Sequence, residues 1–176
     1  FTPSSTNYAK VYLTADKAML TGPLNGYFVK IGNTARDVSL YRQNGSAEIR
    51  IIDGADDRVN GSTIKTKIKV TRDASGRWQL YSDVGPTGNY IPEGTFTDVI
   101  NTTSAYFGAT CVYTSTRSDK FWFDDFNVTG TPVPDMTPPV TRSVAAIDGQ
   151  HIKVLFSESL EINSAQNIGN YSIINT

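Results

Sequence analysis

Apolar and polar residues alternate with a period of two along much of the chain, which is the pattern of half-buried β-strands. In residues 64–70 the apolar side chains alternate with Lys65, Lys67 and Lys69, so that three ammonium groups share one face. We find no window with a convincing helical stripe. The same alternation predicts further strands over residues 10–13, 78–82 and 121–124.

Turn residues separate these apolar runs. Asn44-Gly45 lies between residues 38–43 and 47–52 and predicts a β-hairpin. Both central positions of a type I′ turn need a positive φ, which Asn and Gly tolerate best. Short strands divided by such turns are typical of an antiparallel β-sandwich.

Residues 130–139 contain four of the eight prolines and predict a linker, because proline lacks the N–H that a central strand needs. We therefore predict three parts: a β-sandwich domain over residues 1–130, a proline-rich linker over residues 131–139, and a further β segment over residues 140–176. The last part is too short to bury a complete sandwich core.

Composition excludes several classes of partner. The 176 residues carry 16 Lys and Arg against 17 Asp and Glu, which leaves no basic excess for nucleic acid. The longest apolar runs are far shorter than the roughly 20 residues of a membrane span. One Cys and one His cannot form a Cys/His zinc site. Few charges and many Thr, Ser, Asn and Gly are typical of bacterial extracellular modules.

Several segments resemble, in order, the laminin-G/concanavalin-like jelly-roll modules of secreted multidomain proteins from Bacteroidetes. The resemblance covers residues 1 to about 130 and implies a jelly-roll fold. That family has strands before the position of Phe1, so the resemblance implies either that the first strands are missing or that the sheet is completed by something outside this sequence. The segments are residues 7–13, 24–32, 39–45, 70–73, 78–81, 106–108 and Lys120-Phe121-Trp122-Phe123-Asp124-Asp125-Phe126.

The last part of the chain resembles the start of a bacterial Ig-like domain. The resemblance rests on Pro138-Pro139, on Val154-Leu155-Phe156-Ser157-Glu158 and on a strand expected at Asn170-Tyr171-Ser172-Ile173. In such proteins these modules stand beside other domains of the same chain, so the resemblance implies covalently linked neighbouring domains.

Two groups of aspartates are candidate sites. Asp53, Asp56 and Asp57 follow a predicted strand and offer carboxylates to Ca²⁺, a cation that prefers several oxygen ligands. The alternative is a solvated loop that caps strand ends. Asp124 and Asp125 are adjacent on a predicted strand and would face opposite ways, which suits a hydrogen-bonding role at a sheet edge better than a paired catalytic role.

The sequence argues against catalysis. The glycosidases of the concanavalin fold carry two glutamates close together on one strand, and no pair among the four glutamates of this chain has that spacing. His151 has no nucleophile elbow near it and is expected to be an exposed strand histidine. We therefore predict that the chain is not an enzyme.

Aromatic rings on strands are the candidates for sugar binding, since flat rings stack on sugar C–H groups, although rings on strands also pack into cores. Trp122, Tyr81 and Tyr41 are the candidate ligand-binding residues. The lysine row at residues 65–69 could contact an anionic polysaccharide, but such rows usually solvate a sheet.

The predicted function is that of a non-catalytic extracellular or cell-surface module of a bacterium, which binds a polysaccharide or cell-surface glycan or mediates adhesion. It is not expected to bind nucleic acid or to insert into a membrane. The alternatives are an accessory region of a polysaccharide-degrading enzyme and a purely structural spacer.

Overall fold

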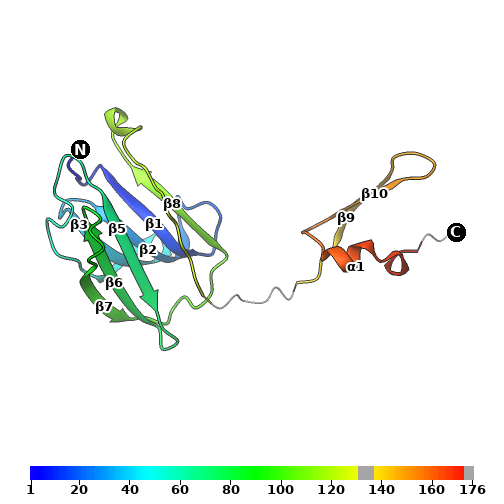
Figure 1. Ribbon diagram of the computed structural model, residues 1–176, viewed down its shortest axis with the longest axis horizontal. Coiled ribbons are helices and arrows are strands. Elements are labelled where there is room, and N and C mark those ends of the chain that lie inside the picture. The colour runs from blue at the N-terminus through cyan, green and yellow to red at the C-terminus, as the bar shows by residue number, and fades with distance from the viewer. Residues whose placement is uncertain (131–136, 173–176) are drawn as a thin grey trace. The chain divides into compact units, whose positions relative to one another are not determined.

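The computed structural model describes residues 1–130 and 137–172 of the chain. They divide into two compact units, residues 1–128 and residues 129–176. The chain is all-β, as the period-two pattern predicts (Figure 1). The strands of the first unit are β1 (Tyr8–Ala15), β2 (Leu24–Gly32), β3 (Asp37–Gly45), β4 (Ala47–Ile52), β5 (Thr66–Arg72), β6 (Arg77–Val84), β7 (Ile91–Thr97) and β8 (Tyr106–Val112).

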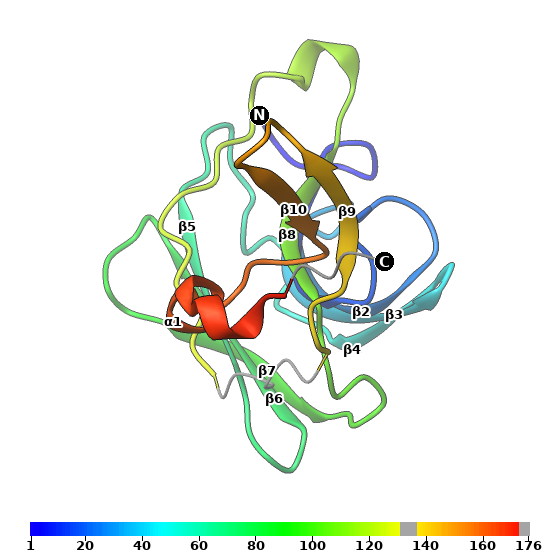
Figure 2. The ribbon, with the colours of Figure 1, turned by 90° about the vertical axis from the view of Figure 1, so that its right-hand side faces the viewer.

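The first unit contains two antiparallel sheets. One sheet has five strands in the order β4-β3-β2-β1-β8, and the other has three in the order β5-β6-β7. Both layers can be followed in the two ribbon views (Figures 1 and 2). The core between them joins residues of both sheets and so makes the unit a β-sandwich. Its buried members are Tyr27, Val29, Val38, Leu40, Ile52, Val59, Trp78 and Leu80.

The middle strands of the five-stranded sheet are buried on both faces. On β2, Tyr27 and Val29 point into the sandwich, while Phe28 between them belongs to a second apolar cluster on the outer face. Tyr12 and Tyr41 join Phe28 in that second cluster. Alternation therefore separates two buried layers on one strand, rather than a core layer from a solvent layer.

The predicted β3–β4 hairpin is present, but its turn differs from the expected one. Asn44 pairs with Ala47, so the central turn residues are Gly45 and Ser46. Gly45 has a φ of 60°, and neither Asn44 nor Ser46 has a positive φ. A positive φ at the first central position alone is the requirement of a type II′ turn, not of the predicted type I′ turn.

The strand predicted at residues 121–124 is wrong. Residues 118–130 contain no strand, and the last element before them is the 3₁₀ turn η1 (Ser115–Arg117). This segment runs back along β8 through ring contacts: Phe126 packs on Phe107 at 5.2 Å between ring centroids, and Phe121 lies 6.2 Å from Tyr113. Asp125 has a φ of 55°, which is incompatible with the extended backbone of a β-strand. Asp124 and Asp125 therefore do not lie on a strand, contrary to the prediction.

The second unit, taken by itself, is a β-hairpin followed by a short helix. β9 (Thr141–Ala146) pairs with β10 (Ile152–Phe156), and α1 (Ile162–Gln166) is capped by the Glu161 carboxylate. The strand expected at residues 170–173 is not formed over residues 170–172: Asn170 ends the 3₁₀ turn η2 (Ile168–Asn170), and residues 171–172 belong to no element. Residue 173 lies outside the described residues. No residue among 137–172 is buried. The Ig-like assignment stays a prediction, as does the linker, whose residues 131–136 are not described.

Candidate functional site

The outer face of the five-stranded sheet carries a dense set of polar and aromatic side chains. Lys10 lies opposite Lys30, and Tyr12 lies opposite Phe28, in the β1–β2 register. Glu48 on β4 lies opposite Gln43 on β3. Because opposite residues in an antiparallel pair share one face, four neighbouring strands contribute to the same surface. We call the set Lys10, Tyr12, Phe28, Lys30, Tyr41, Gln43 and Glu48 the lysine–aromatic face.

An ionic triad forms the centre of this face. The ammonium groups of Lys10 and Lys30 donate to different oxygens of the Glu48 carboxylate, at 3.0 Å for Lys30. Lys30 is only 8 % exposed, which is rare for a lysine and is tolerated when the charge is paired. Burial by itself would raise the pKa of Glu48, but the hydrogen bonds from Lys10 and Lys30 outweigh it, and the pKa lies below its ordinary value.

Aromatic rings form the floor beneath the two lysines. Phe28 and Tyr41 are stacked at 5.2 Å with only 5° between their planes. The Lys30 ammonium lies 4.4 Å from the centroid of Tyr41, and the Lys10 ammonium lies 4.8 Å from that of Phe28. The lysines thus occupy ring faces that a sugar would need for stacking. Tyr41 supports the lysines and does not itself offer a free ring face.

A hollow of about 340 Å³ opens beside the triad. Its residues come from the sheet and from the loop between β1 and β2. Gln43 holds that loop, because its amide donates to the carbonyl of Gly22 at 2.9 Å, while Tyr12 donates to Gln43 Oε1 at 2.6 Å. Burial raises the pKa of Tyr12 to about 12, so this phenol stays a neutral donor. The hollow is lined by Lys10, Tyr12, Leu20, Thr21, Gly22, Pro23, Gln43, Ser46, Glu48, Thr110, Cys111 and Val112.

The chemistry of this hollow suits polyhydroxylated ligands. A paired ammonium and carboxylate can donate to one hydroxyl and accept from its neighbour, and Ser46 and Thr110 add hydroxyls of their own. Leu20, Pro23 and Val112 supply apolar surface for C–H groups. Glu48 is held in its charged form, whereas a general acid needs a raised pKa. Glu48 therefore does not suit the role of a general acid.

The three predicted ligand-binding residues lie in three different places. Tyr41 belongs to the lysine–aromatic face. Tyr81 lies on β6, where the Lys69 ammonium is 5.6 Å from its ring, on the side of the three-stranded sheet away from the core. Trp122 is 79 % exposed on the segment that follows η1. They do not converge on one site. The sequence missed Lys10, Lys30 and Glu48 because their proximity depends on strand register.

Two of the three aspartates proposed as calcium ligands, Asp53 and Asp57, are paired with arginines. Asp53 accepts from Arg50 at 2.7 Å, and Asp57 accepts from Arg36 at 2.6 Å. All three aspartates are exposed. Across residues 1–130 and 137–172, no group of three or more His, Cys, Asp or Glu side chains is arranged to hold a metal ion. The calcium site stays a prediction.

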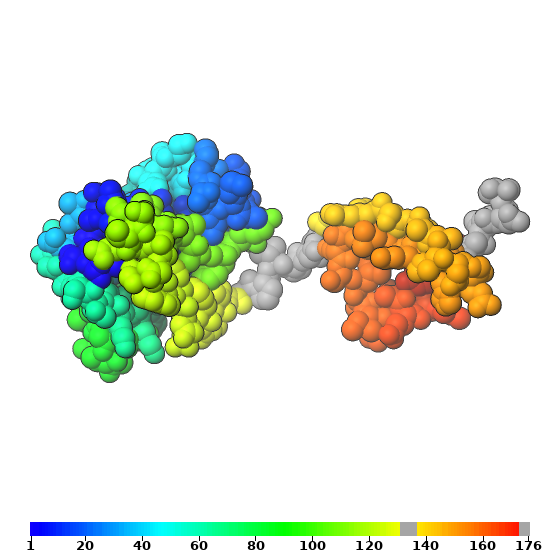
Figure 3. Space-filling model, turned by 90° about the horizontal axis from the view of Figure 1, so that it is seen from above, coloured from blue at the N-terminus to red at the C-terminus, as the bar shows by residue number. Residues whose placement is uncertain are grey.

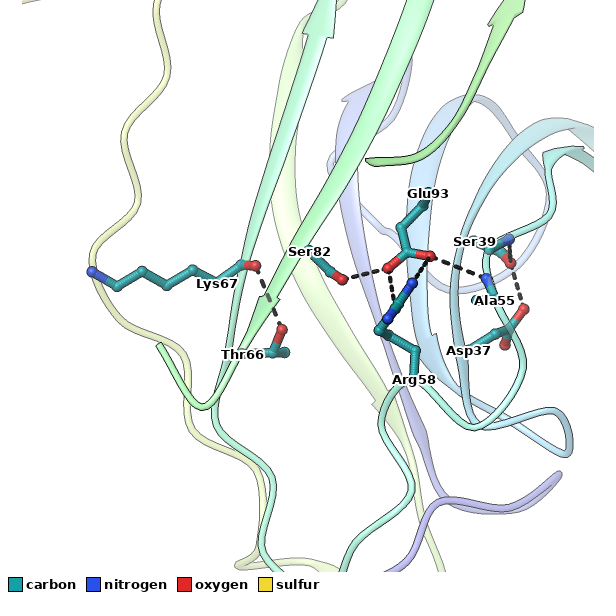
Figure 4. Close-up of polar contacts among 9 residues, drawn as sticks. Asp37, Ser39, Ala55, Arg58, Thr66, Lys67, Ser82 and Glu93 are labelled. Carbon is teal, nitrogen blue, oxygen red and sulfur yellow. Dashed lines mark hydrogen bonds and ion pairs between the residues drawn. The ribbon is translucent and has the colours of Figure 1, made fainter. Parts of the chain in front are cut away.

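A buried carboxylate, which the sequence did not single out, ties the loop after β4 to the three-stranded sheet (Figure 4). The Glu93 side chain on β7 is fully buried and accepts from Arg58 Nε at 2.6 Å, from the Ala55 N–H at 3.0 Å and from the Ser82 hydroxyl. All of these donors belong to the protein, so the Glu93 carboxylate has its hydrogen-bond partners within the fold. This group fixes the loop after β4 to the three-stranded sheet and is not a candidate binding site.

Comparison with known proteins gives one partial match. Over 56 residues the chain is 43 % identical to a protein described as "Surface-layer 125 kDa protein" from Lysinibacillus sphaericus. The match covers 32 % of this chain and 5 % of that protein. No family model and no solved structure matches the chain. Among the described residues, no helix is both long and apolar enough to cross a membrane.

Proposed function

We propose that the chain is a non-catalytic cell-surface module that binds glycans in the hollow beside the Lys10–Glu48–Lys30 triad. The partial likeness to a surface-layer protein supports the location at a cell surface. The observation that carries the binding role is the Lys10–Glu48 ion pair of the triad, both of whose side chains line an open hollow. Paired charges that only stabilised the fold would not need to line such a hollow.

The size and lining of the hollow support a sugar ligand. Its volume lies at the lower end of the range for small-molecule sites and suits a short stretch of a glycan. Hydroxyl, ammonium, carboxylate and amide groups alternate there with a few apolar side chains. This mixture matches a sugar, which presents hydroxyls around its ring and C–H groups on its faces.

A glycan array followed by affinity electrophoresis tests the proposal. The wild-type chain should be retarded in a gel that contains the best polysaccharide from the array. Thr110→Val and Ser46→Ala each remove one hydroxyl from the hollow and should weaken binding by about 3- to 10-fold, the value of one hydrogen bond. Thr71→Val, which makes the same change on β5 of the other sheet, is the matched control and should bind normally.

Three outcomes contradict the proposal. If no polysaccharide or array glycan binds, the chain is a spacer. If the Thr71→Val control weakens binding as much as Thr110→Val does, the glycan binds on the other sheet. Turnover of a polysaccharide by the chain would overturn its assignment as non-catalytic.

A further inference from the structure

Asparagines in the sequence Asn-x-Ser/Thr can accept an N-linked glycan when an oligosaccharyltransferase reaches them. The chain contains five such sequences, and the structure treats them very differently. The five are Asn44-Gly45-Ser46, Asn60-Gly61-Ser62, Asn101-Thr102-Thr103, Asn127-Val128-Thr129 and Asn170-Tyr171-Ser172.

We propose that Asn127 is the glycan acceptor of this chain. Its side chain is exposed, and among the described residues it makes no hydrogen bond. It lies in residues 118–130, which contain no helix or strand. The space-filling view shows this yellow segment at the surface of the first unit (Figure 3). A transferase can bind such a segment without first unfolding a ladder, so the energetic cost of access is small.

Two of the other asparagines have amides that are already engaged or enclosed. The Asn170 amide donates to the Ser164 carbonyl at 2.9 Å and also contacts the Ser164 hydroxyl. The Asn101 amide nitrogen is buried, and its backbone N–H donates to the Tyr27 hydroxyl at 3.3 Å. Either residue would have to leave its local structure before its amide could enter an active site.

The remaining two asparagines lie in tight, hydrogen-bonded turns. Asn44 is the last paired residue before the β3–β4 turn, and Gly45 and Ser46 form that turn. Asn60 donates its backbone N–H to the Asp57 carbonyl at 3.2 Å, and the carbonyl of Ser62 accepts from the N-terminal amino group. The Asn127 sequence has no such restraint, which is why the structure singles it out.

The reaction is a glycosyl transfer from a lipid-linked donor. The Asn127 amide nitrogen forms a bond to the anomeric carbon of an oligosaccharide, and the bond from that carbon to the lipid pyrophosphate breaks. The pyrophosphate leaves with the electron pair, and the amide loses one proton to a base of the transferase. The product would place a glycan beside the chain neighbours Phe126 and Val128, which are 54 % and 70 % exposed. A glycan there would cover apolar surface that is now in contact with water.

An in vitro transfer assay tests the proposal. The folded chain is incubated with a bacterial oligosaccharyltransferase and a lipid-pyrophosphate-linked oligosaccharide, and its intact mass is measured. We expect a gain of one oligosaccharide. Asn127→Gln and Thr129→Ala should each abolish that gain, whereas Asn44→Gln and Asn60→Gln should leave it unchanged.

A synthetic peptide of residues 123–131 serves as the substrate control. The proposal is overturned if the peptide is modified and the folded chain is not, because Asn127 would then be inaccessible. It is also overturned if neither is modified, or if the mass gain persists in Asn127→Gln. Circular dichroism of each variant checks that the substitution has not unfolded the sandwich.

Discussion

The two sheets of the sandwich carry lysines and tyrosines on their outer faces, yet the two faces differ in kind. On the five-stranded sheet, Lys30 is almost fully buried, contacts the Tyr41 ring and shares Glu48 with Lys10. On the three-stranded sheet, Lys67 and Lys69 are exposed, and Lys69 lies over the ring of Tyr81 without a carboxylate partner within ion-pair distance in the described structure. The same residue types thus form a poorly exposed ion-pair cluster on one sheet and a solvated surface on the other.

The difference follows from the neighbours that each strand has. β1, β2, β3 and β4 lie side by side, so Lys10, Lys30 and Glu48 meet although they are far apart in the chain. On the smaller sheet, Lys67 faces Asp83, but that carboxylate is used by the backbone N–H groups of Thr87 and Gly88. A row of lysines in the sequence therefore does not predict whether the lysines are paired or solvated until the neighbouring strands are known.

The largest expected effect comes from Glu48→Gln. The change keeps the shape of the side chain but leaves two poorly exposed ammonium groups without their counter-charge. We expect a loss of about 2–3 kcal/mol in the free energy of unfolding, somewhat less than for a fully buried pair. Urea denaturation measures it. A loss below about 0.5 kcal/mol would mean that the triad contributes no more to stability than ordinary surface ion pairs do. The outer faces of the two sheets would then not differ in this respect.

The pH dependence of the same variant gives the next effect. The pKa of Glu48 in the folded state is lowered, so its charge contributes stability that is complete above its unfolded pKa of about 4.3 and is lost as the pH falls through the folded pKa. The stability difference between wild type and Glu48→Gln should be constant from about pH 6 to 7 and should shrink below about pH 5. A difference that grows on acidification would show that the assigned direction of the shift is wrong.

Tyr12→Phe tests how the hollow is held. Loss of the phenol leaves Gln43 Oε1 without its donor and should cost about 1.5 kcal/mol. Spectrophotometric titration of the nine tyrosines should also lose the component near a pKa of about 12. An unchanged titration at high pH would mean that the Tyr12 hydroxyl is open to water. Tyr81→Phe on the other sheet is the matched substitution, and it should leave that component in place.

The smallest expected difference separates two lysines. Lys30→Met removes a charge that contacts three rings and Glu48 and should cost about 1 kcal/mol. Lys69→Met on the exposed face should change stability by less than about 0.5 kcal/mol. Thermal unfolding of both variants at one pH makes the comparison. Equal effects would erase the distinction between the two outer faces.

Local patterns were enough to predict most of the sandwich. The alternation at residues 64–70 gives β5 with its apolar side toward the core, and the alternation at residues 78–82 lies within β6. The turn at Asn44-Gly45 was placed one residue too early, because the positive φ at Gly45 alone satisfies the turn. The Phe-rich run at residues 121–124 has strand composition but no ladder, since Asp125 takes a positive φ and the rings pack without backbone pairing.

The site was less predictable than the fold. Tyr41 was chosen for its residue type and was expected to contact a ligand. Its ring instead lies beneath the Lys30 ammonium. Lys10 lay in a predicted strand, Lys30 was not singled out, and Glu48 was considered only as one of four glutamates without the glycosidase spacing. Their convergence needs the register of β1 with β2 and of β3 with β4, which no local pattern encodes. Local sequence patterns therefore did not predict which side chains lie close together across the sheet.

We propose that the hollow beside the triad, and not the outer face of the smaller sheet, receives a glycan. A ¹H–¹⁵N NMR titration with the strongest glycan from the array tests this most directly, because every backbone amide reports its own surroundings. The account predicts that the largest shifts fall on Lys10, Glu48 and Thr110. Largest shifts on Lys69 and Tyr81, or on the Trp122 indole, would contradict it.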